Sequence, residues 1–482
     1  MTEPGFSSGS GAEGSPPDWD PPPTQAHRRD PRRGRRALLL SLVVVLLVAG
    51  AGVIWYAARS GSSTGASAPS TPGPPGTSTA TPSASPDAQQ LREVALRSLL
   101  QVREQAVLRH DGTAWLSTVD AGQPTFRAAQ QAEFANLVKL PITRWTYTYD
   151  GPGPQLSSAR RSALGADAWV ADVGLGYRFG AADRSDVHST EALTLTRAGG
   201  RWMVAGNTDG ATDTEVWDLA PLTVVDGRRS VVIGVGAASA LRPFAAQADA
   251  AVGRVSQIWR SAWPRRVVVL VPRTQAQMAR LLGRPSASLS QIAAVTTGEL
   301  TAAAGEPAGG ADQIIVNPSG FAKLSSLGRR VVITHETTHV AVRASTPHAV
   351  SIWLSEGFAD FVGFSGLGLP RTQVAADVLG EVRRGIGPKH LPVESDFDAS
   401  QTTIGPSYSA SWLACELIAD RYGQAKLVAL YRAASGAVTT PGVTASQSPD
   451  EATSAAFDAV LGVSEPSFTK TWLRYLTTLS RQ

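Results

Sequence analysis

One short stretch, Val331 to Phe361, constrains the fold of this 482-residue chain more than any other. It contains His335, Glu336 and His339 in the order His-Glu-Thr-Thr-His, and Glu356 follows seventeen residues after the second histidine. Because residues four apart share one face of a helix, the two histidines can bind one metal ion. A carboxylate from a second helix would complete three ligands and leave a fourth position open, as in hydrolytic zinc sites. The spacing therefore predicts one Zn²⁺ per chain, held between two helices.

The helix that carries the histidines is predicted from about Leu327 to Arg343, with Ser325 or Ser326 as its N-cap. Glu336 is rotated by about 100° from His335 around this helix. It would therefore lie beside the metal ion without binding it, where a general base for water belongs.

A second helix is predicted to begin at Thr346-Pro347, because proline is favoured in a first helical turn. Glu356 and Asp360 are four residues apart on it and share a face. One can therefore bind the metal ion while the other supports a ligand. His348 would lie at the start of this helix and is predicted to be a surface residue.

These segments resemble the gluzincin metallopeptidases, and among them the thermolysin-like and aminopeptidase-type enzymes. That branch has a Trp-Leu-Asn-Glu-Gly-Phe-Ala segment, and this chain has the similar WLSEGFA at 353–359, with Ser355 in place of Asn. The gap between His339 and Glu356 also differs slightly from the aminopeptidase spacing. The resemblance implies that His335, His339 and Glu356 bind zinc, that Glu336 activates water and that Asp360 orients a ligand histidine.

A further donor is needed to stabilise the negative charge that develops on the substrate oxygen. In related enzymes a Tyr or His on a downstream helix supplies it. Tyr408 begins a predicted helix and resembles the downstream Tyr of the family, so we predict this role for it. His390 is the alternative, although it lies in an irregular stretch between two prolines.

The N-terminal part predicts a membrane anchor. Residues 37–58 are 22 residues without a charge, and as a helix they would cross a bilayer core. Six arginines precede this run within 28–36 and only Arg59 follows it, so residues 1–36 are predicted to be a disordered basic cytoplasmic tail. A cleaved signal peptide is disfavoured by the long N-region and the lack of a clean cleavage site. Residues 59–87, rich in Ser, Thr, Pro and Gly, are predicted to be a linker to an extracytoplasmic part.

Charge and cysteine content exclude two other classes. The arginine-rich segment contributes +5 to a net charge of +4, so the rest of the chain sums to −1. No basic face is indicated, and nucleic-acid binding is not expected. The single cysteine, Cys415, excludes an intramolecular disulfide and, in its apolar run, is predicted to be a buried thiol.

Residues 88–220 predict an α+β accessory domain. A helix starts near Ala88, with Leu91 and Val94 among its apolar face, and a second runs from Phe126 to Lys139. Alternating aromatic and apolar residues then predict a meander of strands, with Gly199-Gly200 as its last turn. This order resembles the cone-shaped nuclear transport factor 2-like fold, which implies an accessory or binding role.

Residues 228–482 predict a zincin-type metallopeptidase domain with a mixed sheet and a mostly helical C-terminal half. A strand at Ile314–Asn317 precedes the histidine helix and is expected to be the edge strand that pairs with substrate. The fold class is thus α+β, with a single N-terminal transmembrane helix, a cone-like accessory domain and this catalytic domain.

The sequence thus predicts a membrane-anchored, extracytoplasmic zinc peptidase, a single-pass protein of the cell membrane. Its substrates would be proteins or peptides. An endopeptidase is favoured because the segment with which aminopeptidases of this branch hold a free amine is not found. The alternative is a non-catalytic cell-surface binding or assembly protein on a metallopeptidase-like scaffold. The oligomeric state is not indicated.

Overall fold

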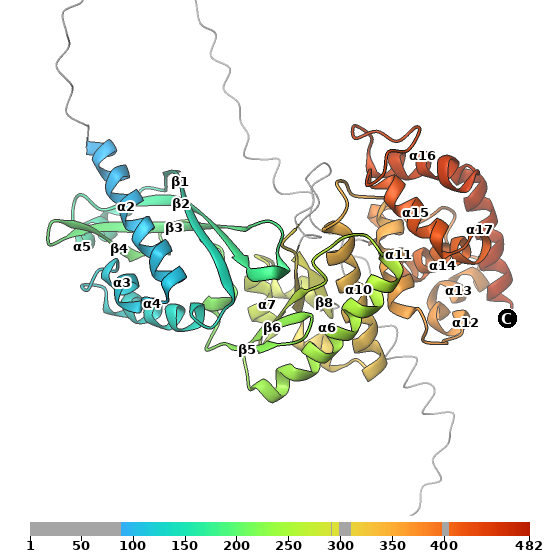
Figure 1. The fold of residues 1–482 in the computed structure, drawn as a ribbon, viewed down its shortest axis with the longest axis horizontal. Helices are drawn as coiled ribbons and strands as arrows, with labels where there is room; N and C mark the ends of the chain where they lie inside the picture. Colours follow the sequence, from blue (N-terminus) through green and yellow to red (C-terminus); the bar gives the residue numbers. More distant parts are fainter. Residues whose placement is uncertain (1–87, 291, 298–309, 398–403) are drawn as a thin grey trace, which may run out of the picture.

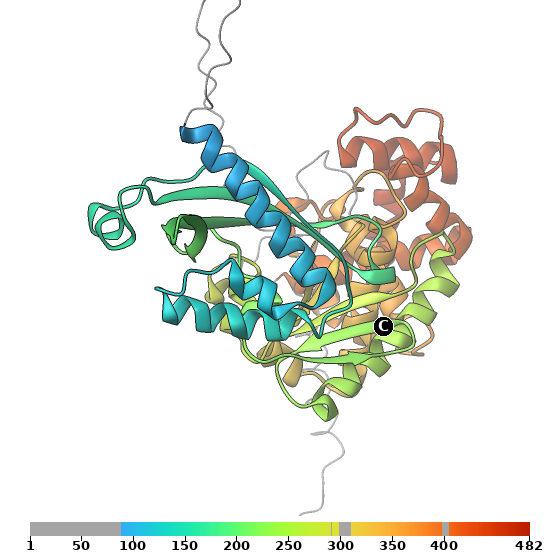
Figure 2. The ribbon, with the colours of Figure 1, turned by 60° about the vertical axis from the view of Figure 1, so that its left-hand side comes forward.

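The computed structural model describes residues 88–290, 292–297, 310–397 and 404–482. A four-stranded sheet with its helices lies beside a five-stranded sheet, and a group of helices lies on the far side of the second sheet (Figure 1). The N-terminal helix α2 crosses the four-stranded sheet, as Figure 2 shows.

Residues 88–220 form the helices and the strand meander that the sequence patterns predict. All four strands are antiparallel, in the order β1-β2-β3-β4, and the Gly199-Gly200 turn joins the last two. The elements are α2 (Ala88–Arg109), α3 (Gly112–Ser117), α4 (Pro124–Leu137), β1 (Ile142–Pro152), α5 (Ser158–Leu164), β2 (Trp169–Phe179), β3 (Val187–Ala198) and β4 (Arg201–Gly206).

The buried face of α2 differs from the predicted one. Leu91 and Val94 are 55% and 63% exposed, whereas Leu96, Leu99 and Leu100 pack on the sheet. Arg92, in the first turns of α2, lines a cavity with Tyr149 and Trp169 of the sheet, so these turns do meet the sheet. At about 100° per residue, Leu91 and Val94 lie on the side of α2 opposite Leu96, so they do not belong to the face that packs.

The five-stranded sheet is mixed, as predicted, in the order β5-β6-β7-β9-β8. The strands are β5 (Thr223–Asp226), β6 (Ser230–Gly234), β7 (Val267–Val271), β8 (Ala294–Thr296) and β9 (Gln313–Val316). β6, β7 and β9 run parallel and are buried on both faces, which explains their continuous runs of Val and Ile. The prediction that the Ile314–Asn317 strand lies at the edge is wrong, because β9 is interior and the three-residue β8 lies outside it.

Each face of this sheet packs against a different part of the molecule. On one face Val232, Val269 and Ile314 contact α6 (Ala238–Trp259) and the C-terminal helices. On the other, Ile233, Leu270 and Ile315 share a core with Trp145, Tyr177 and Trp217 of the accessory part. The accessory part therefore lies on the face of the sheet opposite the helix that carries the histidines.

The C-terminal half is helical, as predicted. Its elements, together with the short α7, are α7 (Gln275–Leu281), α9 (Pro318–Ala322), α10 (Ser326–Arg343), α11 (Ile352–Phe364), α12 (Arg371–Val374), α13 (Ala376–Arg383), α14 (Gly405–Tyr422), α15 (Gln424–Ala434), α16 (Pro449–Leu461) and α17 (Glu465–Ser480). The second predicted helix begins later than expected: α11 starts at Ile352, after Ser351, and not at Thr346-Pro347. His348 lies in the preceding loop, where its backbone N–H donates to Ser435 O.

The predicted fold class needs one correction. Residues 37–58, to which the membrane span was assigned, lie outside the described residues. Along the part of the chain that the structure describes, no helix is long and apolar enough to cross a membrane. The two 22-residue helices, α2 and α6, carry arginines, whereas a bilayer core needs about 20 mainly apolar residues. The fold class is therefore α+β with two sheets, and the transmembrane, cell-membrane and extracytoplasmic assignments are corrected with it.

Candidate metal centre

Helix α10 carries His335, Glu336 and His339 into the interior. It begins after Ser325, whose side chain accepts the N–H of Gly328, as predicted for an N-cap. The intervening threonines, Thr337 and Thr338, are buried too, and each hydroxyl donates to the carbonyl four residues back. Burial of this polar segment is therefore compatible with a regular helix, because its hydroxyl groups are satisfied.

Helix α11 brings Glu356 to the histidines because two glycines let it approach its neighbours closely. A Cβ at Gly357 would lie 2.4 Å from Ser411 O of α14 and 3.0 Å from Cys415 Sγ. A Cβ at Gly363 would lie 3.3 Å from Val331 of α10. Cys415 is buried in this contact, as predicted, and burial raises the pKa of its thiol.

The three predicted ligands converge on one point. His335 Nε2 lies 3.0 Å from His339 Nε2, and Glu356 Oε2 lies 3.3 Å and 3.6 Å from these two nitrogens. All three side chains are buried, and their ligand atoms lie within 4.8 Å of one another. Two imidazole nitrogens and a carboxylate oxygen at this separation can hold a metal ion.

The hydrogen bonding of the Glu356 carboxylate is compatible with a metal site. Its Oε2 is buried and makes no hydrogen bond among the described residues, although both histidine nitrogens are close. A buried carboxylate oxygen without a hydrogen bond is costly, and a metal ion between the three side chains would satisfy it. The residues that are present therefore fit a bound metal ion.

Asp360 orients His335, in the role expected for it. Its Oδ1 lies 2.7 Å from His335 Nδ1, and both groups are buried. A proton held on Nδ1 by this carboxylate leaves Nε2 as the atom directed at Glu356 and His339.

Opposite charges compensate one another in this cluster. Burial would raise the pKa of Glu356, but His339 and His335 lower it to about 2. Burial would lower the pKa of His335, but Asp360 and Glu356 raise it to about 10. Burial outweighs the effect of His335 on Asp360, whose pKa rises to about 6. The facing histidines thus favour the ionised form of Glu356, which is the form in which a carboxylate binds metal.

The Glu336 side chain contacts β8. Thr296 Oγ1 donates to Glu336 Oε2 at 2.8 Å, and both residues are buried. Sequence reasoning missed Thr296, because a three-residue strand gives almost no periodic signal. The motif spacing predicted that Glu336 would be rotated away from the ligands, and Thr296 is the group that holds it there.

The structure places Tyr408 beside the ligands and His390 on the surface. The rings of Tyr408 and His335 have centroids 6.4 Å apart, and Tyr408 is fully buried at the start of α14. His390 is exposed, and its Nδ1 lies 2.9 Å from Leu391 O. Of the two candidates, Tyr408 is therefore the one in contact with the candidate metal centre.

Comparison of the chain with models of known protein families, with curated proteins and with solved structures gave no significant match. We therefore infer the function from the residues of the site and from their geometry.

Proposed function

We propose that the protein is a zinc-dependent peptidase in which Glu336 is the general base. The observation that carries the proposal is the buried group of His335, His339 and Glu356, with the buried Glu336 next to His335 on the same helix. Two imidazoles and one carboxylate are a ligand set typical of catalytic zinc. The resemblance to gluzincins, which rests on the same residues, supports the same assignment.

A bound zinc ion would act as a Lewis acid and make a water nucleophilic near neutral pH. Glu336 would accept the proton of that water and pass it to the leaving amine. The Thr296 hydroxyl donates a hydrogen bond to Glu336 Oε2 and so helps to fix the orientation of the carboxylate. Tyr408 would donate to the substrate oxygen as negative charge develops there.

The position of β8 favours an extended peptide as substrate. β8 is the last strand of its sheet, and its outer edge pairs with no other strand of the described chain. A peptide added to this edge would run past Thr296 and so past Glu336. An endopeptidase remains the favoured form of the proposal.

The test compares full-length protein with Glu336→Gln, and uses Glu394→Gln, an exposed carboxylate, as the matched control. Zinc per chain is measured by elemental analysis, and cleavage of a mixed peptide library by mass spectrometry. We expect one zinc per chain in all three proteins and a loss of cleavage of about 10²–10⁴-fold in Glu336→Gln alone. Stoichiometric zinc without Glu336-dependent cleavage would contradict the proposal and favour the non-catalytic binding protein.

A further inference from the structure

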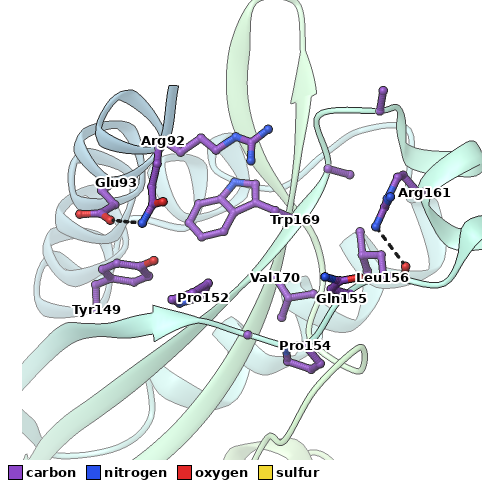
Figure 3. Close-up of a pocket in the computed structure, with 14 residues that line it drawn as sticks. Arg92, Glu93, Tyr149, Pro152, Pro154, Gln155, Leu156, Arg161, Trp169 and Val170 are labelled. Carbon is purple, nitrogen blue, oxygen red and sulfur yellow. Dashed lines mark hydrogen bonds between the residues drawn. The ribbon is translucent and has the colours of Figure 1, made fainter. Parts of the chain in front are cut away.

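A second candidate site lies in the accessory part of the molecule. A cavity of about 380 Å³ is formed where the start of α2, the end of β1 and the start of β2 meet, and the segment before β2 closes it. Figure 3 shows it in close-up. It is built from elements that hold none of the ligands of the metal centre, so the inference does not depend on the proposed function.

Two aromatic rings and two prolines give this cavity flat apolar walls. Tyr149 and Trp169 meet edge to face, with ring centroids 6.2 Å apart and an interplanar angle of 82°. Pro152 and Pro154 lie along the opposite side (Figure 3). Such a pair of rings forms the kind of groove into which a proline ring packs.

Hydrogen-bond donors border the same groove. The indole N–H of Trp169 is buried and has no partner among the described residues. The Arg92 side chain lies beside this ring in Figure 3, and its nearest carboxylate, Asp167, is 3.9 Å away. The Arg92 guanidinium also lies over the Trp202 ring, with its Cζ 5.8 Å from the ring centroid. Arg161 supplies a second guanidinium at the other end of the cavity.

Apolar grooves that also offer donors suit polyproline II segments. Such a segment presents proline rings at regular intervals, and its carbonyls make no internal hydrogen bonds. It therefore gains both from ring packing and from donors that meet its carbonyls. Because proline is already restricted, little entropy is lost on binding.

This chain contains a proline-rich segment that is close in sequence to the groove. Residues 69–75 read Pro-Ser-Thr-Pro-Gly-Pro-Pro. Pro69 and Pro72 are three residues apart, and so are Pro72 and Pro75. Thirteen residues separate this segment from Gln89, which itself lines the cavity. A chain of that length has an end-to-end distance of about 20 Å, so the local concentration of the segment at the groove is in the millimolar range. We infer that residues 69–75 of this chain bind in the groove.

The test is disulfide trapping in the full-length chain. Ala166→Cys places a thiol on the exposed rim of the cavity, and the native Cys415 is too buried to interfere. It is combined with Thr71→Cys inside the segment, or with Ser83→Cys, which is nearer to Gln89 along the chain. Proximity alone would make Ser83→Cys react at least as fast as Thr71→Cys. Binding of residues 69–75 predicts trapping at least about 5-fold faster for Thr71→Cys.

Two further variants make the result specific. Replacing the four prolines of residues 69–75 with serine should reduce the Thr71→Cys rate to the Ser83→Cys rate, and so should Trp169→Ala. The unfolding temperature, measured in parallel, shows whether Trp169→Ala still folds; the serine variant leaves the described residues intact. Trapping of Thr71→Cys no faster than Ser83→Cys would overturn the inference. If a free peptide of residues 69–75 then protected the groove from hydrogen exchange, the occupant would be a segment of another protein.

Discussion

Two regions of this molecule hold carboxylates that are withdrawn from solvent, fully at the candidate metal centre and partly in the accessory part, and these carboxylates are compensated differently. At the metal centre, His339 and His335 lower the pKa of Glu356 to about 2, against the effect of burial. In the accessory part, burial raises the pKa of Glu215 to about 8, and that of Glu191 to about 7 although Arg103 lowers it. Glu215 accepts a hydrogen bond from Tyr177 at 2.9 Å instead of facing a cation.

This difference distinguishes a carboxylate that can bind a metal ion from a carboxyl group that holds a proton in the interior. A carboxyl group that is buried without a facing cation binds a proton, and in that state it cannot bind metal. Glu356 remains ionised in the interior because two imidazoles face it. Burial of an acidic side chain is therefore weak evidence for a metal site, whereas burial together with a depressed pKa is stronger.

The largest expected effect comes from removing the imidazole of His335 at the candidate metal centre. In His335→Ala, Glu356 and Asp360 lose their facing imidazole, and the metal ion loses a ligand. We expect loss of stoichiometric zinc and, in the metal-free protein, destabilisation by about 3–5 kcal/mol. Denaturant unfolding in the presence of a chelator measures this, with the exposed His390→Ala as control. A stability equal to that of the control would show that the charges are not coupled.

Tyr408→Phe tests the proposed donor to the developing oxyanion. It should reduce turnover by about 10²-fold with zinc content unchanged, because one donor to the transition state is lost. Steady-state kinetics on the cleaved peptide measure this effect. Tyr422→Phe, at the other end of α14, is the control and should retain full activity. Full activity in Tyr408→Phe would exclude the role.

Asp360→Asn tests whether the carboxylate that contacts His335 Nδ1 strengthens the binding of zinc by this histidine. Loss of the carboxylate should weaken zinc affinity by about 10–100-fold without preventing folding, because the amide still fills the same space. Competition with a zinc-binding dye gives the affinity. An affinity equal to that of the wild type would limit Asp360 to a packing role.

In the accessory part, the expected effect is on the pH dependence of stability. The pKa of Glu215 in the folded state is about 8, above the usual value of about 4.3. Between these pH values the folded state holds a proton that the unfolded state has released, so this group reduces stability as the pH rises from about 4 to 8. Glu215→Gln should flatten that decline, as measured by urea unfolding at pH 5 and pH 8. An unchanged decline would mean that Glu215 is ionised in the folded protein.

The sequence predicted the three residues of the candidate metal centre better than the elements around it. Spacing alone placed His335, His339 and Glu356, because helical periodicity and ligand geometry leave few alternatives. It did not locate Thr296, which reaches Glu336 only through sheet pairing between residues about 40 positions apart. It also placed Leu91 on the buried face of its helix, although at about 100° per residue Leu91 lies on the side opposite Leu96.

Anomalous scattering from a crystal of zinc-loaded protein tests the central claim most directly. The account predicts a single zinc peak per chain, about 2.0–2.2 Å from His335 Nε2, His339 Nε2 and one oxygen of Glu356, with a further position open. No peak between these three atoms, or a zinc ion bound through other side chains, would contradict it.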